Sequence, residues 1–309
     1  APFVIDGLRV PINQIAENVE KARPGYGIET LAYTFTRKPP KYMKPRPNVA
    51  IKLCSIECDF SRPLSDPNSE LNRKFAGDIE KWSKLAPRLH VWDYTTNFRN
   101  FQTPFPNFHV LQPNVQFFLN HNVRGIFEQG SIDRGGEFAP LRGYLLAKLM
   151  WNPEADVKAL MDEFLHLYYG EAAPYIREYI QLITDTQKAK GGVLIFADRG
   201  SWIDKEMVAK AEIIFANAFT AVDASPRARE LRPRVEVVYL QVQYSALMCP
   251  PDVTITEKDL SLTRPPSLSL EEYAATLKKH GVKHPLDGQN FDGLYKQIGT
   301  VTPPRAFSS

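Results

Sequence analysis

The run VAIKLCS at residues 49–55 decides the fold class, because it is a short apolar segment that predicts a buried β-strand. Three comparable segments lie in the first half of the chain: IETLAYT at 28–34, RLHVWD at 88–93 and VRGIF at 123–127. Short apolar strands that alternate with helices are typical of a parallel sheet. The sequence therefore predicts an α/β fold built on four parallel strands.

Helical patterns separate these strands. Apolar residues recur at helical spacing over residues 11–23, 69–85 and 113–121, and again around 141–149. The strand starts lie 21, 39 and 35 residues apart, close to the roughly 31 residues in each unit of a (β/α)8 barrel. We therefore predict a partial TIM-like barrel of four β/α units over residues 1–150.

The second half of the chain carries almost no strand signal. Residues 157–168 repeat apolar side chains at helical spacing, and we expect Asn152-Pro153 to begin this helix and Asp204 to cap a later one. We predict an α-helical domain over residues 151–250. The pattern weakens after that, so residues 251–309 are predicted to form a Pro-rich segment with little regular structure apart from one short helix near residues 270–280.

Carboxylates follow three successive strands. Glu57, Asp93 and Glu128 stand at or just beyond the apolar runs, and chemistry in parallel β/α sheets collects at the carboxyl ends of strands. Glycoside cleavage needs one protonated acid and one ionised carboxylate beside the scissile bond. We therefore predict Glu57, Asp93 and Glu128 as the catalytic residues of a glycoside hydrolase, with Glu128 or Glu57 as acid/base and Asp93 as partner.

Aromatic and amide side chains accompany these carboxylates and suit the faces and hydroxyl groups of a sugar. The predicted substrate-binding residues are Tyr33, Arg37, Trp92, Tyr94, Asn97 and Gln129. Two of them have an equally supported structural role. Arg37 either clamps a substrate carboxylate or pairs with Glu57, and Trp92 is either a stacking platform or part of the core. Asp59 is expected to cap a turn.

Composition excludes several other functions. The 309 residues carry a formal charge of +3, from 38 basic and 35 acidic residues, too small for a nucleic-acid or membrane footprint. No apolar run is long enough to span a bilayer. Cys54 and Cys58 lack the further ligands of a zinc site and are predicted to be buried thiols, and the six histidines are scattered. No dinucleotide or phosphate-loop motif occurs, so neither a metal nor a cofactor is expected.

Long stretches of the sequence resemble one family. They are TLAYTFTRKPPK (30–41), LCSIECDFSRPLSDPN (53–68), HVWDYTTNFRNFQTPFPNFHVLQPN (90–114), GIFEQG (125–130) and RGGEFAPLRGYLLAKLMWNPEADV (134–157). They resemble the DUF4838 family of bacterial glycoside-hydrolase-like proteins, which is similar to the α-glucuronidase and β-hexosaminidase-like barrels. The resemblance implies that the four units are the C-terminal half of a (β/α)8 barrel, and it implies a periplasmic or extracellular protein.

Half a barrel leaves one sheet edge and part of its core uncovered, and an open edge is an aggregation hazard. We therefore expect upstream sequence or another chain to complete the barrel, and Ala1 to mark a cut in a longer protein. The sequence predicts a protein that hydrolyses, or formerly hydrolysed, glycosidic bonds in complex polysaccharide. The alternatives are a non-catalytic carbohydrate-binding barrel and a structural fragment of a larger protein.

Overall fold

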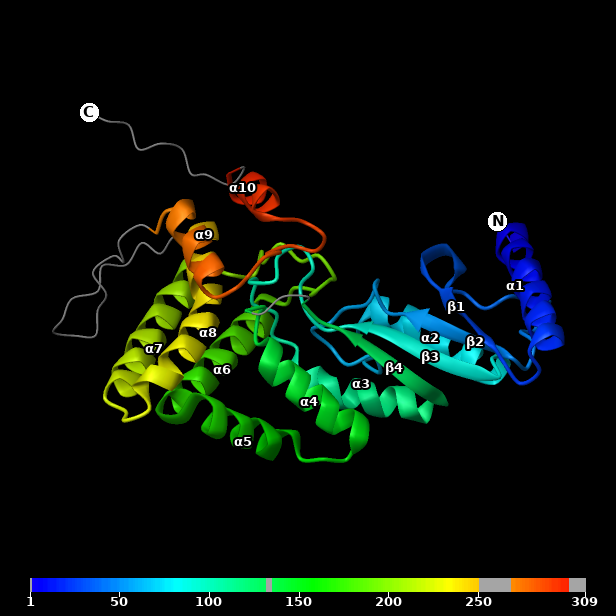
Figure 1. The fold of residues 1–309 in the computed structure, drawn as a ribbon, viewed down its shortest axis with the longest axis horizontal. Coiled ribbons are helices and arrows are strands. Elements are labelled where there is room, and N and C mark those ends of the chain that lie inside the picture. The colour runs from blue at the N-terminus through cyan, green and yellow to red at the C-terminus, as the bar shows by residue number, and fades with distance from the viewer. Residues whose placement is uncertain (1, 132–134, 250–267, 300–309) are drawn as a thin grey trace. The chain divides into compact units, whose positions relative to one another are not determined.

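The computed structural model describes residues 2–131, 135–249 and 268–299, with backbone only for residues 2–10 (Figure 1). The chain divides into two compact units. The first takes its described residues from Ala1–Thr95, Asn107–Gln129 and Lys148–Glu154, and the second from Thr96–Pro106, Gly130–Ala147 and Ala155–Ser309. The chain therefore passes from one unit to the other after residues 95, 106, 129, 147 and 154. The domain boundaries expected at residues 150 and 250 remain predictions.

The first unit contains a four-stranded sheet with the order β1-β2-β3-β4 (Figure 1). Its strands are β1 (Ile28–Ala32), β2 (Val49–Cys54), β3 (Arg88–Tyr94) and β4 (Val123–Gln129), and each pairs with the next in parallel. The prediction of an α/β fold with four parallel strands is thus confirmed. Every neighbour in the sheet is also the next strand in sequence, so the chain winds in one direction across it.

An α-helix follows each of β2, β3 and β4, whereas β1 is joined to β2 by a loop that contains only a short 3-10 turn. The helices that come later in the chain lie in the second unit. In chain order the helices are α1 (Pro2–Ala22), α2 (Glu70–Leu85), α3 (Phe108–Asn120), α4 (Ala139–Trp151), α5 (Val157–Tyr169), α6 (Ala173–Lys190), α7 (Lys205–Asp223), α8 (Ala228–Met248), α9 (Leu270–Lys279) and α10 (Phe291–Gly299). Short 3-10 turns occur at Thr34–Thr36 and Gly170–Ala172. In the second unit α6, α7 and α8 pack on one another, with Tyr179 and Phe215 ring to ring in their core.

The core of the first unit lies on one face of the sheet. Leu53 and Val91 on neighbouring strands are fully buried, and so are Phe75, Ile79 and Trp82 along one side of α2. These three residues follow the i, i+4, i+7 spacing that gives a helix one apolar stripe. Ser69 caps the helix by accepting a hydrogen bond from the backbone of Asn72. The stripe predicted over residues 69–85 is therefore the face that the helix buries.

Several local predictions need correction. The first strand ends at Ala32, two residues earlier than expected, because the chain enters a 3-10 turn in which Thr34 has φ +45°. Helix α3 begins before Pro113, which lies inside it. Helix α5 is capped by Asp156, not Asn152, because the Asp156 carboxylate accepts from the backbone of Ala159. In the described part of residues 251–309, α9 matches the short helix expected near residues 270–280, and α10 is a further helix that was not predicted. Asp204 caps α7 as expected.

Residues 96–106 form a long loop between β3 and α3. This loop belongs to the second unit, where backbone hydrogen bonds hold it. The Phe98 amide donates to Phe196 O at 3.0 Å, and the Phe101 amide donates to Pro285 O at 2.9 Å. The amide of Glu137 in turn donates to Phe101 O at 2.7 Å. Segments distant in sequence thus fix this loop in place.

We predict that Ile79→Ala lowers the free energy of unfolding by about 2–5 kcal/mol, because it leaves a cavity between α2 and the sheet. Lys81→Ala on the exposed side of the same helix is the control and should change it by less than about 0.5 kcal/mol. Urea denaturation followed by circular dichroism measures both. Equal effects would contradict the burial of this stripe.

Candidate functional site

The pairing of β3 with β4 places the predicted site residues in register. Asp93 lies beside Glu128, Trp92 beside Phe127 and Tyr94 beside Gln129. Successive side chains of a strand point to opposite faces, so the two carboxyl groups share one face and the aromatic residues share the other. The structure therefore brings Asp93 and Glu128 together and turns Trp92 and Tyr94 away from them.

Asp93 is a buried carboxyl group with two donors. Only 5% of the residue is exposed, the Ser55 hydroxyl donates to its Oδ1, and the amide of Tyr94 donates to the same atom at 2.9 Å. Burial raises the pKa of Asp93 to about 6, and the two hydrogen bonds oppose that rise. Asp93 therefore keeps its proton to a higher pH than an exposed aspartate does.

Glu128 is more strongly perturbed. Its Oε2 is buried and has no hydrogen-bond partner among the described residues. Burial raises the pKa of Glu128 well above its usual range, and the charge of Asp93 raises it further. Two neighbouring carboxyl groups in such surroundings hold different protonation states, which is the arrangement that separates an acid from a base. Burial and the mutual repulsion of the two carboxyl groups thus favour a state in which the pair retains a proton.

Glu57 is not part of this pair. It forms an ion pair with Arg37, whose Nε also donates to Asp78 Oδ2 at 2.9 Å. Arg37 is buried, and its carbonyl accepts a hydrogen bond from Trp82 Nε1 at 2.7 Å. Of the two roles considered for Arg37, the pairing with Glu57 is the one observed. The single positive charge of its guanidinium group is thus shared between two carboxylates of the protein.

The aromatic group lies on the other face of the sheet. Trp92 Nε1 donates to Gln129 Oε1 at 2.7 Å, and the Trp92 ring stacks beside Tyr94 and meets Phe127 edge-on with 4.8 Å between centroids. Phe127 is 46% exposed and was missed by the sequence analysis. The sequence could have indicated Phe127, because it lies two residues before Gln129 on the same strand and its side chain therefore points to the same face. Tyr33 is also partly exposed, just after β1.

A model of one family, described as Domain of unknown function (DUF4838), matches residues 8–181, more than half of the chain. The chain belongs to this family. No curated protein and no solved structure matches it. Within the DUF4838 chain, the match covers the whole sheet and the pair formed by Asp93 and Glu128.

Asn97 serves the second unit of the DUF4838 chain. It is fully buried, its Nδ2 donates to Asp198 O at 2.8 Å, and its Oδ1 accepts from the amide of Arg99 at 2.9 Å. Both ends of the amide are thus engaged in holding the loop 96–106. The structure does not group Asn97 with the residues at the strand ends.

A charged group missed by the sequence analysis lies on the aromatic face. Glu29 contacts Lys52 Nζ at 2.5 Å and His90 Nδ1 at 2.6 Å, and Lys52 lies 6.0 Å from the centre of the Trp92 ring. A Cβ at Gly125 would lie 3.2 Å from the His90 ring, so glycine leaves room for it. Lys52 and His90 lower the pKa of Glu29 against the opposing effect of burial.

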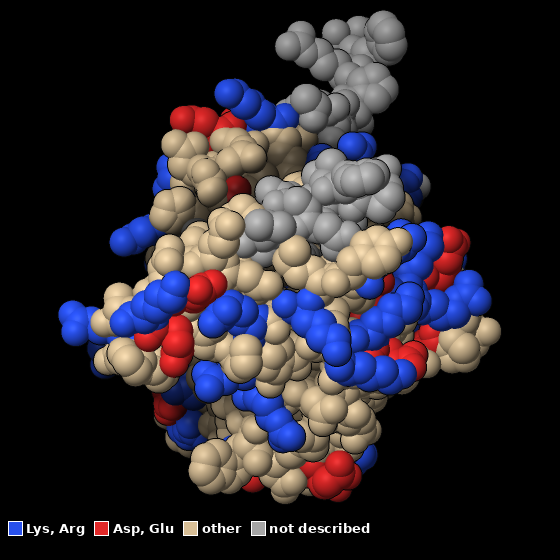
Figure 2. Space-filling model, turned by 90° about the vertical axis from the view of Figure 1, so that its right-hand side faces the viewer, with Lys and Arg blue, Asp and Glu red and all other residues tan. Residues whose placement is uncertain are grey.

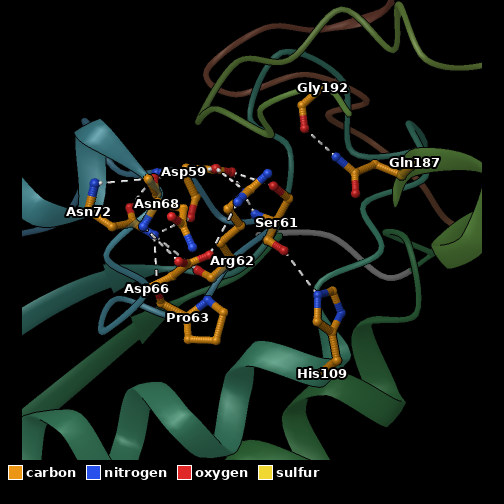
Figure 3. A network of polar contacts seen from close by, with 11 residues as sticks. Asp59, Ser61, Arg62, Pro63, Asp66, Asn68, Asn72, His109, Gln187 and Gly192 are labelled. Atoms are coloured by element: carbon orange, nitrogen blue, oxygen red, sulfur yellow. Dashed lines mark hydrogen bonds and ion pairs between the residues drawn. The ribbon is translucent and has the colours of Figure 1, made fainter. Parts of the chain in front are cut away.

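The loop between β2 and α2 carries a polar network (Figure 3). Asp59 Oδ1 accepts from the amide of Ser61 at 2.9 Å, which confirms its predicted role in a turn. Asn72 accepts from the amide of Asp59 at 2.8 Å and donates to the carbonyls of Arg62 and Pro63. His109 Nε2 lies 3.0 Å from Ser61 O and ties the loop to α3. This network fixes the loop that carries Glu57.

No helix within residues 2–131, 135–249 and 268–299 has the length and apolar character needed to cross a membrane. The same residues contain no group of three or more His, Cys, Asp or Glu side chains placed to hold a metal ion. Cys54 and Cys58 are buried free thiols, as predicted. Acidic and basic side chains lie among one another on the face drawn in Figure 2.

We predict that Glu128→Gln weakens the pH dependence of stability. A carboxyl group with a raised folded pKa favours the native state below its unfolded pKa, and that contribution is lost as the pH rises through the folded value. For Asp93 the window runs from about 3.8 to about 6, and for Glu128 it extends higher. The melting temperature of the native chain should therefore fall between about pH 4 and pH 8 more steeply than that of Glu128→Gln.

Glu178→Gln is the control for this measurement, because Glu178 is exposed and should leave the slope unchanged. If the melting temperature changes with pH equally in the native chain and in Glu128→Gln, Glu128 is not protonated in the folded protein.

Proposed function

We propose that this chain is part of a carbohydrate-processing protein in which Glu128 is the general acid and Asp93 is the partner carboxylate. One observation carries the proposal: two carboxyl groups with raised pKa values lie in register at the carboxyl ends of neighbouring parallel strands. That edge is where β/α folds bear chemistry. An acid protonated at neutral pH beside an ionised carboxylate is the combination that glycoside cleavage uses.

The sheet order supports the further proposal of a closed barrel. A sheet in which each strand neighbours the next in sequence winds in one direction, as the strands of a (β/α)8 barrel do, whereas doubly wound sheets reverse. Both edge strands, β1 and β4, pair with only one other strand among the described residues. Further β/α units, from this protein or a second chain, would pair with these edges and enclose the aromatic face.

In such a barrel the aromatic face lines the interior, where Trp92, Tyr94, Gln129 and Tyr33 would hold part of a glycan. The cleaved bond would lie beyond the strand ends, beside Asp93 and Glu128. The ring of Trp92 and the exposed ring of Phe127 offer apolar surfaces, and the Gln129 amide keeps its N–H donors for hydroxyl groups. Glu57 and Arg37 form an ion pair with each other. Their role would therefore be to hold the loop that follows β2 in position.

The alternative function is carbohydrate binding without cleavage. It is favoured by the strand alternation, which turns the aromatic residues to one face and the carboxyl pair to the other. A sugar stacked on Trp92 would then be held without contact to the acid. A measurement of glycoside turnover distinguishes the two functions, because a protein that only binds carbohydrate releases no cleaved product.

We predict that Glu128→Gln lowers kcat on a cleaved glycoside by about 100-fold or more, the usual contribution of a general acid. Chromogenic uronic-acid and hexosamine glycosides are the substrates, and Asp93→Asn should likewise lose most of its turnover, because it removes the partner carboxylate. Glu178→Gln, on the exposed side of α6, is the matched control. Unchanged turnover in Glu128→Gln would remove Glu128 from the mechanism, and binding without turnover in the native chain would favour the alternative.

The barrel proposal predicts that the chain self-associates when no other β/α units are present. Association would bury the aromatic face and pair the free backbone groups of both edge strands. Size-exclusion chromatography with light scattering measures the mass, and hydrogen exchange measures protection of β1 and β4. A monodisperse monomer with fully protected edge strands would contradict it.

A further inference from the structure

We propose that the second unit holds a separate binding site for a small ring-shaped carboxylate, in a cavity between the start of α4, the end of α5 and the middle of α8. This site is independent of the function proposed for Asp93 and Glu128. It lies wholly among residues of the second unit, and its test measures binding instead of turnover.

The cavity has a volume of about 640 Å³, within the range of small-molecule pockets. Its lining residues are apolar, aromatic or basic: Gly135, Gly136, Phe138, Ala139, Pro140, Tyr168, Tyr169, Pro233, Arg234, Val237, Val238 and His280. No Asp or Glu belongs to this lining. A cavity with an arginine and without a carboxylate on its wall favours an anion over a cation.

Arg234 is held in one orientation. Its guanidinium group lies 4.5 Å from the centre of the Tyr168 ring, and its Nη1 donates to Tyr168 O at 2.8 Å. Nη2 pairs with Glu230 at 2.8 Å, one turn earlier on α8 and outside the cavity lining. An arginine fixed by stacking and by a backbone acceptor loses little freedom on binding, so its remaining N–H groups are pre-oriented for a carboxylate.

Tyr169 is the second polar group of this cavity. It is 1% exposed, and its ring meets the Tyr168 ring edge-on with 5.0 Å between the centroids. Burial raises the pKa of Tyr169, so the hydroxyl stays protonated and remains a donor. A protonated hydroxyl in the lining of the cavity can donate a hydrogen bond to a ligand oxygen that reaches it.

His280 adds a third polar group. Its side chain is 7% exposed and its Nε2 forms no hydrogen bond within the described residues, although Glu236 Oε2 lies 3.3 Å away. Burial lowers the pKa of His280, against the raising effect of Glu236, so the ring is neutral at pH 7 and offers a hydrogen bond and no charge. The positive charge at the wall therefore comes from Arg234, which Glu230 balances in part, with a contribution from the amino-terminal end of α4 at Ala139.

The shape of the wall favours a ring as the body of the ligand. Phe138, Tyr168 and Pro140 provide flat apolar surfaces, and Phe138 adopts φ +44°, a conformation that side chains rarely take. Strain of this kind is maintained only where the surroundings fix it. A cyclic carboxylate places its ring against these surfaces and its charge at Arg234.

D-Glucuronate and D-glucose are the matched probes, because their rings differ only in the carboxylate. Saturation-transfer NMR and calorimetric titration should show binding of glucuronate and much weaker binding of glucose. Arg234→Gln should weaken glucuronate binding about tenfold or more, as expected for a lost charge-assisted hydrogen bond. Tyr169→Phe, which preserves the packed ring, should weaken it by a few-fold.

Equal binding of glucose and glucuronate, absence of glucuronate binding, or an unchanged affinity in both variants would overturn the proposal. If Arg234→Gln does not fold, Tyr169→Phe and the comparison of the two sugars decide. Glucuronate binding should persist in Glu128→Gln, since Glu128 does not line the cavity. Loss of binding in Glu128→Gln alone would place the sugar at the strand ends and contradict the site in the second unit.

Discussion

The parallel register of β3 against β4 is the constraint on which the candidate site depends. It places Asp93 directly beside Glu128. Because like charges on neighbouring residues repel each other, the two carboxyl groups do not both ionise readily. Burial adds to this effect for both residues. The chemistry of the pair therefore follows from strand pairing, and a shift of one residue in that register would separate the carboxyl groups onto opposite faces.

The same alternation explains why two kinds of polar group occupy one sheet without neutralising one another. On the face that carries the carboxyl pair, Asp93 accepts hydrogen bonds from two uncharged donors, the Ser55 hydroxyl and the backbone amide of Tyr94. On the aromatic face, Glu29 is matched by Lys52 and His90. Arg37, which follows β1, forms ion pairs with Glu57 and Asp78. The raised pKa values persist because no arginine or lysine of the described residues pairs with Asp93 or Glu128.

The sequence predicted the architecture well and the site in part. Short apolar runs predicted all four strands, since period and length distinguish them from helices, and the stripe of α2 followed from its spacing. Ends and caps were less predictable: Asp156 and Asn152 are both good cap residues, and only the fold selects between them. Carboxylates at strand ends were found correctly, but linear order does not show partners. Glu57 was therefore grouped with Asp93 and Glu128, and Asn97 with residues of the other unit.

The path of the chain between its two units has a consequence for how they are made. Since the backbone changes units after residues 95, 106, 129, 147 and 154, no single cut releases either unit with all of its parts. The loop 96–106 leaves the sheet unit and returns to it, and it is secured by segments as late as Pro285. The loop that follows β3 therefore acquires its final contacts only after most of the chain has been synthesised. Assembly of the two units is thus expected to be a shared, late event and not a sequence of independent ones.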